Sequence, residues 1–316
     1  MSLLYPERDE NQMISDQQTI DAIAASPKDF VELAQVTRGG LVESWHRGIA
    51  VVTDPEGKTI VHKGNAKRLI YPRSAIKPLQ TVAMVRAGLD LTGKELAITS
   101  ASHRSTPEHI AIVQGILAKA GLPENALLCP EGIQYNCSGK HAGFLYSCVK
   151  SGWSTADYLS VDNPIQKLVV EVLEEFGSER ILKTAVDGCG APLHAMTVEG
   201  IARSIGKFTK QETSLVDNLT ANGWVISNHG VPDAVLLDSG FIAKNGAEGV
   251  FVVGTRSGYG ICIKIADGNL RAAPLVAIKL MLEQDLITHE AYLDLYSKLA
   301  VPSLGGGKPQ GEIIAC

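Results

Sequence analysis

Apolar and polar positions follow two different periods along this chain. Runs rich in β-branched residues flank a Pro-Glu-Gly turn within residues 47–64, which predicts a β-hairpin. Apolar residues at helical spacing predict helices over residues 74–89, 105–121 and 162–177. Residues 1–35 are polar and then weakly helical, so we expect an N-terminal extension there and a single domain over 36–316.

Signals at the helix ends support two of these helices. In the helix over 105–121, Ser105 or Thr106 can cap the first turn, Pro107 suits that turn, and Gly121 can end the helix. The helix over 162–177 repeats the same order of cap, proline, apolar stripe and terminal glycine. Both segments are therefore predicted as helices with defined ends.

The second half of the chain predicts more strands and one further helix. Residues 249–273 read as a strand pair broken by glycines, a helix follows from about Pro274 to Leu286, and the glycine-rich end looks loose. Hairpins and helices alternate without the regular βαβ rhythm of a parallel sheet. We therefore expect an α+β fold with a mainly antiparallel sheet flanked by helices.

Composition narrows the class of protein. The 316 residues are 45% hydrophobic, include 31 glycines and carry a net charge of −5, so we expect no nucleic acid and no membrane as a partner. The first residues lack the basic start and apolar core of a secretory signal. Six cysteines in a long chain of this kind are expected to be free thiols in a reducing cytoplasm, mostly buried as small apolar residues.

The segment "PRSAIKP" holds the first candidate for catalysis. Ser74 and Lys77 are three positions apart and so are neighbours on a helical turn, where a lysine of lowered pKa can take the serine proton. Serine–lysine pairs of this spacing also arise by chance. In addition, Pro78 disfavours helical angles at the lysine, which weakens the pattern when it stands alone.

A second candidate lies at "TSASHRSTPEH". Ser102 and His103 stand where an apolar run ends and a capped helix begins, a junction that exposes side chains and backbone N–H groups. The alternative is that the serines here only cap the helix. Position alone does not separate the two interpretations.

The segments "YNCSGKHAGF" and "VDGCGAP" concentrate reactive groups between glycines. Cys137, Lys140 and His141 lie in the first segment, and Cys189 lies in the second. Zinc normally takes four Cys, His or carboxylate ligands, and lysine must first lose a proton from a group of pKa about 10.4. Residue chemistry alone therefore favours a metal here only weakly.

Lys264 in "GICIKIADG" is the fourth candidate. In an alternating strand, Lys264 shares one face with Cys262 while three isoleucines occupy the other face. A lone lysine in such a strand usually lies on the solvent-exposed face of an edge strand. The strand pattern by itself gives it no chemical role.

Taken together, these segments resemble one known family. "TRGGLVESWHRG", "YPRSAIKPLQ", "ASH", "NCSGKHAGF", "DGCGAP" and "AKNGAEGVF" occur in that order and span roughly residues 35–273. They resemble the Rhizobium-type, or class 3, L-asparaginase II family. This resemblance implies a fold similar to the serine β-lactamases, a homodimer, and hydrolysis of L-asparagine to L-aspartate and ammonia.

The resemblance also implies roles for individual residues. It places the catalytic serine–lysine tandems on Ser74 with Lys77 and on Ser102 with Lys264. It places zinc on Cys137, Lys140 and Cys189, and the substrate pocket on Arg73, His141, Asp187 and Gly188. We expect Ser74 to attack after losing its proton to Lys77, although the sequence does not decide which of the two serines is the nucleophile.

Two alternatives and several departures accompany this interpretation. "RSTPEH" follows "ASH" where the family usually has a small residue and glycine, and the stretch 226–240 looks shortened. A penicillin-recognising hydrolase shares Ser-x-x-Lys, but this chain lacks a K-T-G triad. A non-catalytic amino-acid-binding module would keep the pocket without turnover. Ammonia release from asparagine separates both alternatives from the amidohydrolase.

Overall fold

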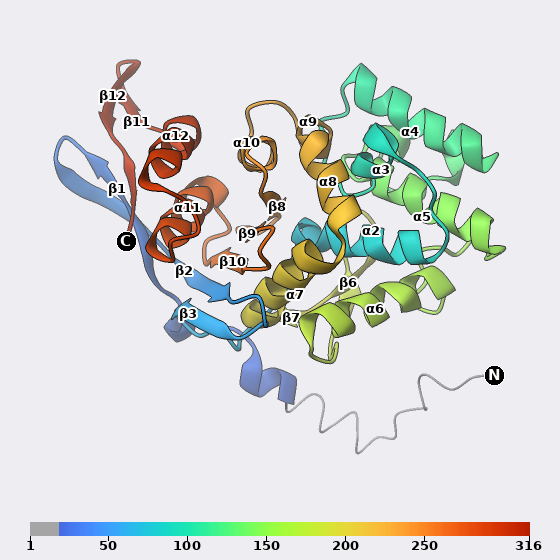
Figure 1. The fold of residues 1–316 in the computed structure, drawn as a ribbon, viewed down its shortest axis with the longest axis horizontal. Coiled ribbons are helices and arrows are strands. Elements are labelled where there is room, and N and C mark those ends of the chain that lie inside the picture. Colours follow the sequence, from blue (N-terminus) through green and yellow to red (C-terminus); the bar gives the residue numbers. More distant parts are fainter. Residues whose placement is uncertain (1–18) are drawn as a thin grey trace.

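The computed structural model describes residues 19–316 and contains one seven-stranded sheet flanked by helices (Figure 1). Its strand order is β13-β1-β2-β10-β9-β8, with β3 paired to β2, and every pair is antiparallel. The predicted fold class, a mainly antiparallel sheet with flanking helices, is confirmed. The strands of this sheet are β1 (Val31–Arg38), β2 (Leu41–Thr53), β3 (Thr59–Lys63), β8 (Ile242–Gly246), β9 (Val250–Gly254), β10 (Gly260–Ile265) and β13 (Ile313–Ala315).

Shorter strands and the helices complete the described chain. Three two-stranded sheets pair β4 (Leu69–Ile70) with β7 (Met196–Thr197), β5 (Thr184–Val186) with β6 (Pro192–His194), and β11 (Ser303–Gly305) with β12 (Lys308–Gly311). The α-helices are α2 (Lys77–Arg86), α3 (Gly93–Ile98), α4 (Pro107–Ala120), α5 (Ser138–Ser151), α6 (Pro164–Gly177), α7 (Val198–Gln211), α8 (Thr213–Ala221), α9 (Gly223–Ile226), α10 (Pro232–Asp238), α11 (Ala273–Glu283) and α12 (His289–Leu299). The 3₁₀ turns are η1 (Pro27–Asp29), η2 (Arg73–Ile76), η3 (Glu124–Ala126), η4 (Gly132–Gln134) and η5 (Leu270–Ala272).

The sheet separates two apolar cores. Helix α7 packs on one face, where Cys262 of β10 joins a core shared with the helices α2 to α6. Helix α11 packs on the other face, where Ile261 and Ile263 of β10 join a second core that includes α12. Each fully buried isoleucine contributes about 1.5–3 kcal/mol, so these alternating positions anchor β10 in the middle of the sheet.

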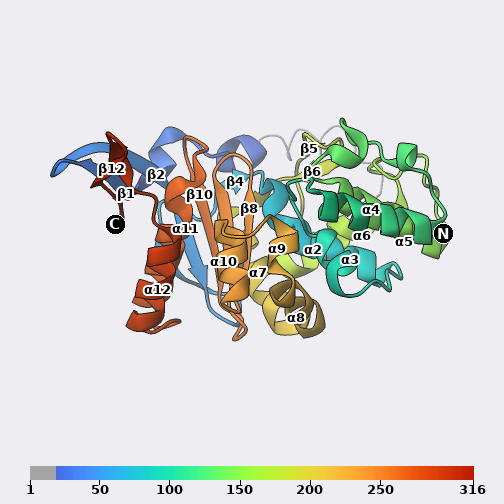
Figure 2. The same cartoon turned by 90° about the horizontal axis from the view of Figure 1, so that it is seen from above.

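The helices α4, α5 and α6 form a lobe at the end of the molecule away from β11 and β12 (Figure 2). Strand β8 is the edge of the sheet on the side of this lobe, and the turn η2 lies against it. The segment that carries Ser74 and Lys77 therefore joins the sheet to the helical lobe. Among residues 19–316, no helix is long and apolar enough to cross a lipid bilayer.

Most predicted elements are confirmed, with ends that follow the local chemistry. β2 and β3 form the expected hairpin, and β9 with β10 forms the expected strand pair. Helix α4 begins after the cap Thr106 and ends at Gly121, whose φ of 67° satisfies the left-handed C-cap. Helix α6 begins after the cap Asn163, but Ser178 with φ 51° takes the left-handed position that we expected Gly177 to provide.

Two predictions about the chain ends need correction. The C-terminal segment, predicted to be loose, forms the β11–β12 hairpin and then β13, which pairs with β1 through Ala34 and Ala315. Strand β1 begins at Val31, so the last residues of the predicted extension 1–35 lie inside the sheet. Residues 1–18 of that extension lie outside the described residues.

Candidate active site

A cavity of about 540 Å³ lies where β8, η2, the loop after α3 and the segment before α5 meet. Ser74 and Ser102, two of the predicted catalytic residues, both line it. The other lining residues are mostly polar, and Arg104 and Glu131 bring one charge of each sign: His103, Arg104, Ser105, Glu131, Gln134, Tyr135, Asn136, Ser227, Val231, Asn245, Gly246, Ala247 and Leu270. A cavity with charged side chains of both signs and many hydrogen-bonding groups suits a small polar ligand.

Ser74 follows a backbone residue in an uncommon conformation. Arg73 has φ 54°, in the left-handed region that non-glycine residues seldom adopt, and its Nε donates to Asp187 Oδ1 over 2.7 Å. Gly246 of β8 approaches the same turn so closely that a Cβ there would lie 2.3 Å from the Pro72 carbonyl oxygen. These contacts hold η2 against the sheet edge and present Ser74 to the cavity.

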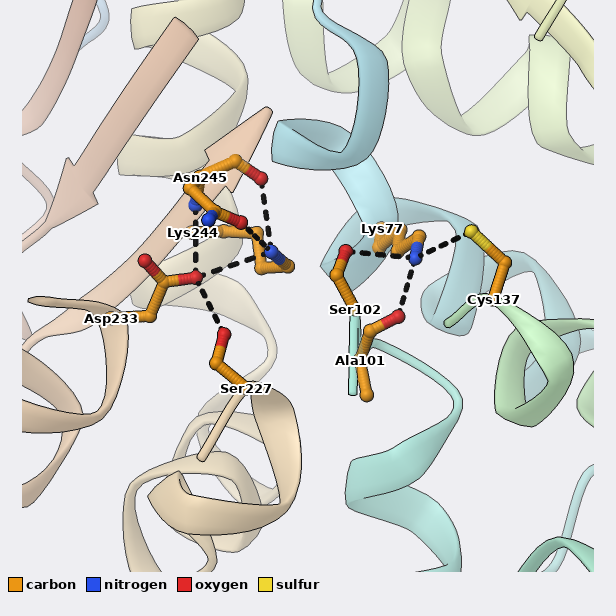
Figure 3. A network of polar contacts seen from close by, with 8 residues as sticks. All are labelled: Lys77, Ala101, Ser102, Cys137, Ser227, Asp233, Lys244 and Asn245. Atoms are coloured by element: carbon orange, nitrogen blue, oxygen red, sulfur yellow. Dashed lines mark hydrogen bonds and ion pairs between the residues drawn. The ribbon is translucent and has the colours of Figure 1, made fainter. Parts of the chain in front are cut away.

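Lys77 is the first residue of α2 and is almost completely buried, at 1% exposure. Lys77 has helical angles, φ −56° and ψ −35°, although Pro78 follows it, and Pro78 itself falls in the first turn, where its missing N–H costs nothing. Lys77 Nζ donates to Ser102 Oγ over 3.0 Å, to Cys137 Sγ over 3.1 Å and to the Ala101 carbonyl (Figure 3).

The structure thus brings Lys77 to Ser102, whereas the predicted tandem joined Lys77 to Ser74. Among residues 19–316, the Ser74 hydroxyl makes no hydrogen bond. Lys77 Nζ donates to Ser102 Oγ, so the hydroxyl proton of Ser102 is free to point elsewhere. Hydrogen bonds of catalytic groups are often completed only when substrate binds, so the predicted role of Ser74 stays a prediction.

Lys244 is a second buried lysine that the sequence analysis missed. Its Nζ donates to Asp233 Oδ2 over 3.2 Å, to the Asn245 carbonyl over 2.9 Å and to Asn245 Oδ1 (Figure 3). Burial lowers the pKa of Lys244 and the nearby Lys77 charge adds to this effect, while Asp233 opposes it. "AKNGAEG" carries this lysine, and the close approach of Gly246 to η2 is the physical reason that it reaches the site.

Lys264, predicted to pair with Ser102, lies elsewhere. It stands on β10, an inner strand rather than the expected edge strand, and its Nζ donates to the Glu248 carbonyl. Burial lowers its pKa, and Glu248 opposes that change. The tandem of Ser102 with Lys264 is therefore not formed in this structure, because β10 lies two strands away from β8, the strand that borders the cavity.

His103 borders the cavity in its neutral form. The Ser105 backbone N–H donates to its Nδ1 over 3.1 Å, so Nε2 carries the proton and donates to Ser138 Oγ over 3.0 Å. Burial, with the charges of His109 and Lys77, lowers the pKa of His103 to about 3. His103 therefore positions Ser138 near neutral pH and carries no charge there.

The three predicted zinc ligands lie together at the start of α5. Lys140 Nζ donates to Cys189 Sγ over 3.2 Å, and Cys137 and Cys189 share a small buried cluster. The Cys189 thiol and the neighbouring lysine charges lower the pKa of Cys137 to about 4, which favours a thiolate. Two thiol groups and one amine that converge in this way fit zinc as ligands.

The number of ordinary zinc ligands at this site is small. No group of three or more His, Cys, Asp or Glu side chains within residues 19–316 is arranged to hold a metal ion. The predicted set has only two such ligands and needs Lys140 as the third. Gly139, which we expected to allow a tight turn, instead lies in the first turn of α5, where a Cβ would lie 2.4 Å from the Ile98 carbonyl oxygen.

The predicted substrate residues form two separate groups. Arg73 and Asp187 are paired with each other, and the Gly188 backbone N–H donates to Asp187 Oδ1 over 2.8 Å. His141 is fully buried, with Nδ1 2.7 Å from the Tyr158 hydroxyl and with Nε2 lacking a hydrogen-bond partner within the described chain. Burial and nearby lysine charges hold the pKa of His141 well below its ordinary value.

Comparisons with solved structures give likenesses of low similarity. Mglu in its native form is 15% identical, with a TM-score of 0.47, over 91% of this chain and 74% of its own. A β-lactamase (Mb2281c) from Mycobacterium bovis is 14% identical, with a TM-score of 0.44, over 75% of this chain and 94% of its own. A Bacillus glutaminase is 14% identical, with a TM-score of 0.43, over 87% and 98% of the two chains. TM-scores below 0.5 are too low to support an argument about this chain.

A comparison with curated proteins finds no match. The comparison with family models, in contrast, identifies the family. The family model described as L-asparaginase II matches residues 34–134 and 130–315, which together span both serines, both cysteine segments and nearly all of the main sheet. The match supports amidohydrolase activity and confirms the family that the sequence motifs indicated. The chain is therefore a member of the L-asparaginase II family.

Proposed function

We propose that this protein hydrolyses L-asparagine to L-aspartate and ammonia by serine–lysine catalysis. The observation that carries the proposal is the buried Lys77, 3.0 Å from Ser102 Oγ, beside a cavity that Ser74 also lines. A buried lysine that contacts Ser102 and stands three residues after Ser74 in the chain can provide both a base for a nucleophile and a route for a proton. Family membership supports the class of reaction.

In the proposed reaction, Ser74 Oγ gives its proton to neutral Lys77 and attacks the side-chain amide carbon. The Ser102 hydroxyl then passes a proton to the departing nitrogen and receives one from Lys77, so the C–N bond breaks and ammonia leaves. A water molecule hydrolyses the resulting ester and releases aspartate. Ser102 suits the relay because it lies between Lys77 and the cavity.

We assign the amino-acid head group to the pair formed by Arg73 and Asp187. The guanidinium can bind the substrate carboxylate, and the carboxylate of Asp187 can bind its ammonium. These two side chains bind each other in the structure over 2.7 Å, so a zwitterion would replace one ion pair by two. His141 and Gly188 stay predicted members of this subsite.

Zinc, if bound by Cys137, Lys140 and Cys189, would supply a fixed cation that holds α5 to the segment before β6. Cys137 also contacts Lys77 over 3.1 Å, so this site would influence where the catalytic lysine lies. The protein residues alone provide the nucleophile and the base in the proposed reaction. Zinc, the homodimer and the cytoplasmic location stay predictions.

Ammonia release tests the proposal. L-asparagine and L-glutamine are supplied separately to the purified protein, and the Ser74→Ala variant is assayed beside the parent with circular dichroism as a folding control. We expect turnover of asparagine, and a loss on the order of a millionfold in Ser74→Ala. Asparagine binding without ammonia release would instead favour the amino-acid-binding module. More than a tenth of the parent activity in the folded variant would reject Ser74 as the nucleophile.

A further inference from the structure

One wall of the cavity has its hydrogen-bonding directions fixed by groups buried behind it. Ser227 and Asn245 line the cavity, and both contact the buried pair of Asp233 and Lys244 (Figure 3). Asp233 is 1% exposed and Lys244 is 0% exposed, so neither charge faces solvent. The two polar residues that line the cavity therefore depend on this hidden ion pair for their orientation.

Ser227 is fixed as a hydrogen-bond acceptor toward the cavity. Its hydroxyl donates to Asp233 Oδ2 over 3.0 Å, and a carboxylate can only accept. The single proton of the hydroxyl is thus used on the buried side. The lone pairs of Ser227 Oγ remain for a donor that enters the cavity.

Asn245 is fixed as a donor. The Lys244 ammonium can only donate, so the atom of the Asn245 side chain that it contacts must be the oxygen. The Asn245 backbone N–H also donates to Asp233 Oδ2 over 3.1 Å, which holds the residue from a second side. Its Nδ2 group donates to no other residue of the described chain, so two N–H bonds remain available.

We propose that Ser227 and Asn245 form the subsite that recognises the carboxamide of the substrate, with Asp233 and Lys244 as the positioning residues behind them. The inference rests on the proposed function and deepens it. A primary amide offers one carbonyl oxygen and one NH₂ group, which match one donor and one acceptor. Asn245 Nδ2 donates to the amide oxygen, and Ser227 Oγ accepts from the amide nitrogen.

The charge balance of this wall distinguishes it from the head-group subsite. The Lys244 and Asp233 charges offset each other, and the two residues that face the cavity are neutral. Neutral partners suit a neutral amide, whereas the charged head group has Arg73 and Asp187 available. The wall therefore suits the carboxamide, which is the part of the substrate that reacts.

The arrangement also separates substrate from product. Aspartate presents a carboxylate, which has no N–H to give Ser227 and places a lone pair against the lone pairs of Oγ. A site that hydrogen-bonds a particular group rejects the analogue without it, because its own polar atom stays unpaired. Ser227 therefore favours asparagine over aspartate, while Asn245 serves an oxygen that both ligands possess.

Binding measurements test this without turnover. Calorimetric titration of the Ser74→Ala protein with L-asparagine and L-aspartate gives two dissociation constants, and the measurement is repeated after adding Ser227→Ala. Ser204→Ala is the matched control, because Ser204 is a buried serine that donates to a backbone carbonyl in α7. We expect Ser227→Ala to weaken asparagine about tenfold and to leave aspartate unchanged or tighter. Ser204→Ala should move neither constant.

Each outcome decides between the alternatives. An equal loss for both ligands would place Ser227 on the shared head group and would overturn the proposal, as would no loss for either ligand. If asparagine fails to bind the Ser74→Ala protein at all, the proposed function fails, and this inference falls with it.

The positioning role has its own readout. Asp233→Asn should reduce the preference for asparagine over aspartate, because Ser227 is then free to turn its proton toward the cavity. Asp29→Asn is the matched control, since Asp29 is a buried carboxylate that accepts from Ser26, Asn65 and Arg68 and does not line the cavity. A purely structural role would lower the melting temperature of both variants and leave the ratio of the two constants intact, which would overturn the assignment.

Discussion

The two buried lysines beside the cavity have opposite surroundings (Figure 3). Lys77 contacts a hydroxyl, a thiol and a backbone carbonyl, and none of these is a carboxylate. Lys244 contacts the carboxylate of Asp233, with both remaining acceptors supplied by Asn245. The two lysines can therefore have different roles because their partners differ. Lys77 is suited to proton transfer, and Lys244 is suited to holding the buried Asp233 carboxylate in place.

This difference assigns separate measurable effects to the two lysines. A lysine that exchanges protons with serine should affect kcat above all, whereas a lysine paired with a buried carboxylate should affect folding and the shape of the wall. The predictions below test that contrast, from the largest expected effect to the smallest.

Lys77→Met should reduce kcat for ammonia release by at least about ten-thousandfold, because it removes the base and the proton source together. Lys264→Met is the control, since Lys264 donates to the Glu248 carbonyl and does not contact Ser102. Steady-state kinetics on both variants measure the effect. Comparable losses in the two variants would contradict the assignment and return Lys264 to the catalytic tandem that the sequence suggested.

Lys244→Met should destabilise the protein by about 3–5 kcal/mol, because it leaves the Asp233 carboxylate buried without a partner. Urea unfolding measures the free energy of unfolding. The double variant with Asp233→Asn should recover part of that loss, since the uncompensated charge is gone. A double variant as unstable as the sum of the two single variants would show that the pair is not coupled.

Cys137→Ala and Cys189→Ala should each remove bound zinc, raise KM and lower kcat less. Elemental analysis of the parent protein should find about one zinc per chain. Cys262→Ala is the control, because Cys262 is a buried cysteine of β10 in the core beside α7. Metal-free parent protein, or full zinc content in both variants, would leave the two thiols as core residues only.

His103 should make the protein less stable in acid. Its pKa is lowered from 6.5 to about 3, so the folded state prefers the neutral ring and binds fewer protons than the unfolded state. Its stabilising contribution is complete above pH 6.5 and is lost as pH falls toward about 3, with a slope of up to about 1.4 kcal/mol per pH unit. His103→Gln should flatten the acid side of the melting-temperature profile, whereas His289→Gln, at an exposed position of α12, should leave it unchanged.

Local chemistry made much of the fold predictable. Caps such as Thr106 and Asn163, prolines in first turns and apolar stripes predicted α4 and α6 with ends close to those observed. The structure also places Ser74, Lys77, Ser102 and Cys137 in one region, as the joint appearance of their motifs in the family pattern suggests.

Local sequence patterns do not predict which strands pair when those strands are far apart in the chain. Lys244 and Lys264 both stand in short strands near glycines, and only the strand order places Lys244 at the edge next to η2 and Lys264 inside the sheet. The local sequence of the glycine-rich C-terminal segment predicts a loose end, because it does not reveal that β13 pairs with β1, nearly the whole chain away. Hydrogen-bond directions, such as that of Ser227 toward Asp233, also required the structure.

The packing of η2 against β8 has a consequence for solubility. β8 ends the sheet, and an uncovered edge strand offers its backbone to any other chain that can add a strand. The turn that carries Ser74 lies against that strand, with Gly246 allowing the two backbones to meet. A substitution that displaces this turn would therefore move the predicted nucleophile and uncover the edge strand at the same time, so variants that displace this turn should be both inactive and the most prone to aggregate.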